Sequence, residues 1–127
     1  MRGLERLFSD LQARGYAEVE RMTGSKGTLF AVIRNFQVPA GRFEGRIIDL
    51  AIPAPPDYPD SFGSSIHVQA NPQLLERGNV ANVRNIVESE LGGEWCYWSK
   101  NFNGSRGTGE RDTRRLLSQI NEVFLNA

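Results

Sequence analysis

The chain has 127 residues, of which 39% are hydrophobic and 24% charged, and this balance suits one globular domain over residues 1–127 with a single modest core. Fifteen basic and fifteen acidic residues cancel, so the net charge draws the protein neither to nucleic acid nor to an anionic membrane. The N-terminal stretch carries charges where a secretory signal would have an unbroken apolar run, and no run of roughly 18 apolar residues could span a membrane. One cysteine forms no internal disulfide, which fits a reducing compartment. We therefore expect a cytoplasmic protein.

The first predicted element is an amphipathic helix near the N-terminus. Leu4, Leu7, Phe8 and Leu11 recur at the i, i+3, i+4, i+7 spacing that places apolar side chains on one face of a helix. Gly15 stands where such a helix would end, because glycine readily adopts the left-handed conformation that commonly follows a helix C-terminus. We therefore expect a helix that packs its apolar face on the core.

Four consecutive strands are predicted after this helix, at residues 17–22, 29–36, 47–52 and 64–70. The third strand has the two-residue period of a sheet and ends at Pro53, because proline donates no hydrogen bond to a neighbouring strand. Short connections between consecutive strands favour an antiparallel meander.

The second half of the chain is harder to assign. Apolar residues at 80–87 fit a helix that ends at Gly92-Gly93, and an irregular segment is the other interpretation. Residues 92–99 (GGEWCYWS) fit either a short extended segment or a loop, and the glycine-rich residues 102–109 predict a surface loop. From Asp112 onward, apolar residues at helical spacing predict a closing helix. This order indicates an α+β fold of two layers.

Three short motifs occur in a fixed order along this framework. They are Pro39-x-Gly41-Arg42-Phe43, Asp49-Leu50-x-Ile52-x-x-Pro55-x-x-Tyr58-Pro59 and Trp95-x-x-Trp98-Ser99-Lys100. Together they resemble the ubiquitin-conjugating (UBC) superfamily, especially the bacterial branch called prokaryotic E2-like family E. The resemblance implies a UBC-like two-layer fold with an N-terminal helix, a four-stranded antiparallel meander, an active-site loop region and a C-terminal helix.

The resemblance also implies an enzyme. In the family, a cysteine receives the C-terminal carboxyl of a ubiquitin-like modifier as a thioester and then transfers it to an amine of a protein. This chemistry needs a thiolate nucleophile and hydrogen-bond donors for the tetrahedral oxyanion. Cys96 is the sole thiol and therefore the candidate acyl carrier, and Asn101 is the candidate oxyanion donor.

The partners implied by the resemblance are a ubiquitin-like modifier, an activating enzyme and an acceptor protein, with a deconjugating metalloprotease, in bacterial pathways associated with antiphage defence. The activating enzyme docks on the N-terminal helix of the parent fold, so Arg2, Arg6 and Arg14 are candidate docking residues. No cofactor, nucleic acid or membrane partner is expected. One histidine and one cysteine are too few ligands for a convincing zinc site, so no metal is expected either.

The same residues allow a second function from a different class. In a non-catalytic UBC-like or RWD-like binding module, Cys96 would be an inert core residue, since free cysteine is often a small buried hydrophobe. Access to the sulfur separates this module from the enzyme. His67, inside the fourth predicted strand, fits a structural or solvent-facing role better than that of a general base. Residues 104–109 (GSRGTG) lack the Gly-Lys-Ser/Thr ending of a phosphate-binding loop.

Overall fold

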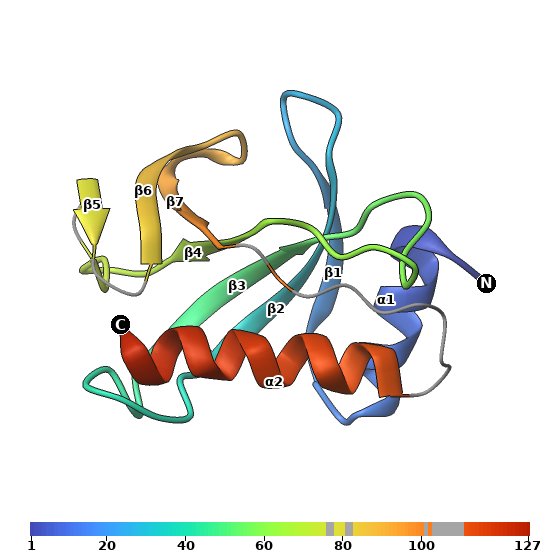
Figure 1. The fold of residues 1–127 in the computed structure, drawn as a ribbon, viewed down its shortest axis with the longest axis horizontal. Helices are drawn as coiled ribbons and strands as arrows, with labels where there is room; N and C mark the ends of the chain where they lie inside the picture. The colour runs from blue at the N-terminus through green and yellow to red at the C-terminus, as the bar shows by residue number, and fades with distance from the viewer. Residues whose placement is uncertain (76–77, 81–82, 101, 103–110) are drawn as a thin grey trace.

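The computed structural model describes residues 1–75, 78–80, 83–100, 102 and 111–127, which form two helices and one sheet (Figure 1). The elements follow one another as α1 (Gly3–Ala13), β1 (Val19–Thr23), β2 (Leu29–Gln37), β3 (Ile47–Pro53), β4 (Ser65–Gln69), β5 (Gly78–Val80), β6 (Val83–Ser89), β7 (Gly92–Ser99) and α2 (Arg111–Asn126). The strands lie in the order β1-β2-β3-β4-β7-β6-β5, and neighbours are antiparallel. The predicted α+β class with a helix at each end is confirmed.

Helix α1 has the predicted apolar face. Leu7 and Leu11 are fully buried, whereas Leu4 and Phe8 lie at the margin of the core. The helix ends at Ala13, and Gly15 then takes a φ of 92° with its N–H donating to the carbonyl oxygen of Gln12 at 3.0 Å. Within the described residues, neither helix combines the length and the apolar character of a membrane span.

The first four strands form the predicted meander, with bounds that differ from the predicted ones by two residues or fewer. Strands β2 and β3 pair from Phe30–Pro53 to Gln37–Ile47, with one extra residue inserted in β2 between Ile33 and Phe36. Asn35 occupies this bulge with a φ of 55°, a conformation that Asn tolerates better than most residues. Its backbone N–H donates to Asp49 Oδ1 at 3.2 Å, so the bulge is held by a side chain of the next strand.

The prediction of only four strands was wrong, and so was that of a helix or irregular segment at 80–87. For residues 92–99, the extended interpretation is confirmed and the loop is not. Residues 78–99 instead form three strands that extend the sheet beyond β4. Gly92, with a φ of 129°, begins β7 where the chain reverses direction, and Ile86 then pairs with Trp98 across the hairpin. Valine and isoleucine favour strands, so pairing with a neighbour outweighs the helical spacing of these apolar residues. Apart from Phe102, the predicted surface loop at 102–109 lies outside the described residues.

The main core lies between the sheet and the two helices. Helix α2 runs across one face of the sheet, and α1 lies near its N-terminal end (Figure 1). Five buried residues of α2 contribute to the core, namely Leu116, Leu117, Ile120, Val123 and Phe124. The sheet contributes large side chains such as Trp98, whose ring centroid lies 5.5 Å from that of Phe124.

A second, smaller core covers the opposite face of the sheet. Phe30, Val32, Ala51 and Trp95 are buried there. The β1–β2 and β6–β7 turns meet through Glu90. Its carboxylate accepts hydrogen bonds from the backbone N–H of Lys26 at 3.1 Å and from the hydroxyl of Thr28 at 3.0 Å. The sheet is therefore curled so that its two hairpin tips touch. This contact holds the two hairpins against each other on the face that α2 does not cover.

Candidate functional site

Cys96 lies in the middle of a central strand. In β7 it is flanked by Val68 of β4 on one side and Glu88 of β6 on the other. Its side chain belongs to the core beneath the helices and is 3% exposed. The sulfur is therefore not accessible at the surface, because side chains alternate along a strand and this position faces the covered side.

The aromatic residues around Cys96 divide between the two cores. Trp98 shares the helix-side core with Cys96 and is fully buried, whereas Trp95 belongs to the second core and Tyr97 contacts His67 on that same face. Asn101, the predicted oxyanion donor, lies outside the described residues. The catalytic roles of Cys96 and Asn101 therefore stay predictions.

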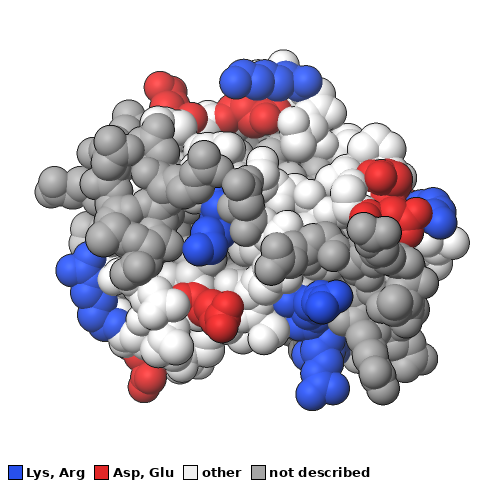
Figure 2. Space-filling view, in the orientation of Figure 1, with Lys and Arg blue, Asp and Glu red and all other residues white. Residues whose placement is uncertain are grey.

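Two of the three arginines predicted to dock an activating enzyme are engaged within the chain. Arg2 forms an ion pair with Asp60 at 2.5 Å, and Arg6 donates to Asp10 at 2.8 Å across one helical turn. Arg14 follows the end of α1 and is exposed. Over the described part of the face in Figure 2, basic and acidic side chains are interspersed rather than gathered by sign. The docking surface for an activating enzyme remains a prediction.

The Tyr58-Pro59 motif has a structural role that links both helices. Tyr58 is fully buried, and its hydroxyl shares a hydrogen bond of 2.5 Å with Thr113 Oγ1 of α2. The same Thr113 oxygen donates to Asp10 Oδ2 of α1 at 2.6 Å, and the backbone N–H of Gly3 donates to the Tyr58 carbonyl at 2.9 Å. Sequence reasoning missed Asp10 and Thr113, because no local pattern marks partners that are more than a hundred residues apart.

His67 is a buried, neutral residue on the face opposite Cys96. Its Nδ1 lies 2.6 Å from Ser89 Oγ and its Nε2 lies 3.2 Å from Ser65 Oγ. The rings of Phe30 and Tyr97 pack edge-on against it at 4.7 and 5.2 Å. Burial lowers the pKa of His67 to about 4, and the negative charge of Glu90 in the β6–β7 turn raises this pKa by a smaller amount. With both ring nitrogens engaged, its geometry is that of a structural histidine.

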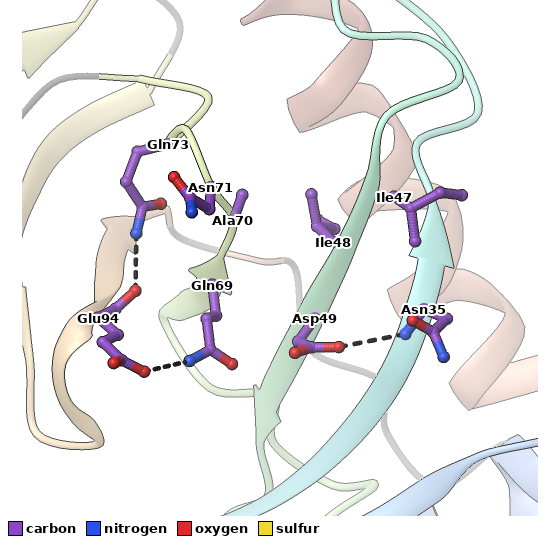
Figure 3. A pocket seen from close by; sticks show the side chains of 9 residues that line it. All are labelled: Asn35, Ile47, Ile48, Asp49, Gln69, Ala70, Asn71, Gln73 and Glu94. Carbon is purple, nitrogen blue, oxygen red and sulfur yellow. Dashed lines mark hydrogen bonds between the residues drawn. The ribbon is translucent and has the colours of Figure 1, made fainter.

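A hollow of about 510 Å³ opens where β3 and β4 separate (Figure 3). Strand β4 pairs with β3 only from Asp49 to Ala51 and ends at Gln69, whereas β3 begins two residues earlier, at Ile47. The chain turns away at Asn71. We call this hollow the β3–β4 notch, and it is lined by Asn35, Ile47, Ile48, Asp49, Gln69, Ala70, Asn71, Gln73 and Glu94.

Hydrogen bonds hold the walls of the notch in place. Gln69 donates to Glu94 at 2.9 Å, and Gln73 donates to the backbone carbonyl of Glu94 at 2.7 Å. Arg34, on the adjoining part of the sheet, donates to Asp49 at 3.1 Å and pairs with Glu20 at 3.0 Å. The notch is thus a preformed hollow with a carboxylate from β3 and another from β7. Sequence reasoning did not find it, because it arises from where β4 ends relative to β3.

An α+β chain with a helix at each end, an antiparallel meander and a buried Tyr-Pro exit that ties the helices together has the features of a UBC-like protein. The chain belongs to prokaryotic E2 family E, whose family model matches residues 9–126 and which implies the UBC fold. The family predicted from the three motifs is thereby confirmed. In general terms, membership connects the chain with ubiquitin-like conjugation, a transferase reaction that involves a modifier and an activating enzyme. Comparison with curated proteins and with solved structures gave no match.

Proposed function

We propose that this chain is a protein-binding module of a ubiquitin-like conjugation pathway, built on the UBC fold, with Cys96 as a core residue. The observation that carries the proposal is the position of Cys96 in the centre of β7, 3% exposed and beneath the helices. Family membership supplies the pathway, and the burial of the sole thiol favours binding over catalysis.

The chemistry of thioester transfer explains why burial matters. The sulfur must reach the terminal carbonyl of a modifier and release it later to an amine, so both reactants need a path to it. A cysteine between two paired strands has no such path unless the helix-side core opens. In an apolar environment the thiol form is also favoured over the thiolate nucleophile.

Catalysis by Cys96 is the second candidate, and membership of an E2 family is the observation that favours it. In this form of the proposal, Cys96 carries the modifier and Asn101 stabilises the oxyanion. It requires a conformation in which Cys96 and Trp98 leave the core together, since both side chains lie on the same face of β7.

Thiol accessibility and adduct formation distinguish the two candidates. We expect iodoacetamide to leave Cys96 unmodified in the native protein and to modify it fully in denaturant, as measured by intact mass. With an activating enzyme, its modifier and ATP, the binding module forms no adduct that a thiol reductant removes. Cys96→Ala should bind the same modifier with unchanged affinity in calorimetry. A reducible adduct on the native chain that is lost in Cys96→Ala would overturn the proposal.

A further inference from the structure

We infer that the β3–β4 notch binds an extended segment of a partner protein that carries an arginine or lysine. The inference rests on the proposed function, because it assigns a surface and a partner chemistry to the binding module. Three features of the notch carry it: an open strand edge, an excess of carboxylates and an apolar wall.

The open edge belongs to the first residue of β3. The N–H of Val38 donates to the carbonyl of Arg46 at 2.9 Å, so the backbone of residue 46 points toward β2. Backbone groups alternate in direction along an antiparallel strand, so those of Ile47 point to the other side, into the notch. Strand β4 has already ended there, and its register pairs no residue with Ile47. An extended peptide can add to such an edge through its own backbone.

The charge of the notch favours a cationic side chain. Among the described residues that line the notch, the charged ones are Asp49 and Glu94, and both are acidic. Figure 3 shows their carboxylates on either side of Gln69, whose carboxamide bonds to Glu94. Arg34 pairs with both Asp49 and Glu20, so one arginine is shared between two carboxylates. A guanidinium or ammonium group can therefore gain charge-assisted hydrogen bonds here.

An apolar wall completes the site. Ile48 and Ala70 line the notch beside Ile47, a large hydrophobic residue that is 54% exposed. The volume of about 510 Å³ falls in the range of about 300–1,000 Å³ that is typical of ligand sites. Because Ile47 and Asp49 are two residues apart in β3, their side chains face the same side. A side chain of an added strand that lies on Ile47 is therefore directed to the same side as the carboxylate of Asp49.

Three blocked pentapeptides test this inference by titration against the full ¹⁵N-labelled chain. The first is acetyl-Val-Gly-Arg-Gly-Val-amide, and the second has Glu in place of Arg. The third is the Arg peptide with methylated backbone nitrogens. We expect the Arg peptide to shift the amide signals of Ile47, Asn71 and Glu94. The Glu peptide should bind about threefold to fivefold more weakly, the loss that removal of an exposed ion pair predicts. Methylation should weaken binding about fivefold or more, through lost backbone hydrogen bonds.

A pair of protein variants locates the charge effect. Glu94→Gln keeps the size of the side chain and should weaken the Arg peptide about threefold to fivefold. Glu122→Gln, on the exposed surface of α2, is the matched control and should leave the affinity unchanged. The ¹⁵N spectrum of each variant reports whether its fold is retained.

Three results would overturn the inference: equal binding of the Arg and Glu peptides, signal changes confined to other surfaces, or no signal change at millimolar peptide. Each would leave the proposed function standing as long as Cys96 is unreactive in the native protein and the modifier still binds. Conversely, a reducible adduct at Cys96 would refute the proposed function, regardless of which peptides bind to the notch.

Discussion

On the face of the sheet that α2 covers, Cys96 lies among apolar side chains, whereas on the opposite face His67 and Arg34 lie in networks of polar partners. The same strand, β7, contributes to both environments, because Cys96 and Tyr97 are neighbours that face opposite sides. A cysteine can therefore be buried in an apolar core while the next residue of the same strand faces polar side chains. In our proposal, partner recognition takes place on the polar face, whereas the helix-covered face contributes the larger apolar core.

The strongest test of the contrast is removal of the largest side chain that shares the covered core with Cys96. Trp98→Ala should lower the free energy of unfolding by about 3–5 kcal/mol, because it empties a large, fully buried volume. Urea denaturation measures this loss. Iodoacetamide should then modify Cys96 in the folded state. The control is Leu125→Ala on the exposed side of α2, which should change stability by no more than about 0.5 kcal/mol.

The polar face should respond to pH through His67. Its pKa is about 4 in the folded protein against 6.5 in the unfolded chain. The unfolded state therefore binds a proton first, and stability is fully present above pH 6.5 and is lost as the pH falls toward 4. The slope is about 1.4 kcal/mol per pH unit from this group, and the total is on the order of 3 kcal/mol.

Denaturation at a series of pH values measures this dependence, and His67→Gln provides the comparison. The variant should be less stable at neutral pH and should lack the histidine contribution to the slope between pH 6.5 and 4. An unchanged slope would mean that carboxylates, rather than His67, control the acid stability of this face.

An intermediate effect is expected where the two helices meet the Tyr-Pro exit. Thr113→Val keeps the shape of the side chain but removes the hydroxyl that joins Tyr58 to Asp10. The free energy of unfolding should fall by about 1–2 kcal/mol, because the buried partners of the removed hydroxyl remain without it. Ser118→Ala, at an exposed position of the same helix, should have little effect in the same thermal or urea unfolding experiment.

The smallest effect concerns the environment of the sulfur itself. Cys96→Ser should be less stable than Cys96→Ala by about 1 kcal/mol, because a hydroxyl in a dry apolar core lacks the partners that water would provide. The two variants differ by one polar atom, so their unfolding free energies compare polarity at nearly constant shape. Equal stabilities would indicate that solvent reaches position 96.

The N-terminal half of the fold could be predicted from local patterns. The spacing of Leu4 to Leu11 specifies one face of a helix, and the alternation in β3 together with Pro53 specifies a strand and its end. The three motifs were sufficient to predict the family. Residues 80–87 could not be assigned in this way, because β-branched residues at these positions fit more than one local structure until a neighbouring strand is present.

The candidate site was less predictable, for a related reason. Residue type and motif identified Cys96, but its burial follows from the pairing with Val68, a contact across 28 positions of sequence. Likewise, the β3–β4 notch depends on the end of β4 at Gln69 and the start of β3 at Ile47. Neither relation has a signature within a short window, so the chemistry of a residue could be proposed from sequence while its accessibility could not.

The strand order also has a consequence for assembly of the fold. The strand that joins β4 is β7, the last of the three that follow it, and in the described part of the sheet β6 pairs with β7 and β5 with β6. A chain that stops before residue 92 would therefore leave β5 and β6 with no neighbour to connect them to the meander. The pairing of β4 with β7 therefore joins this half of the sheet to the meander by contacts between distant parts of the chain, which is the kind of topology that slows folding.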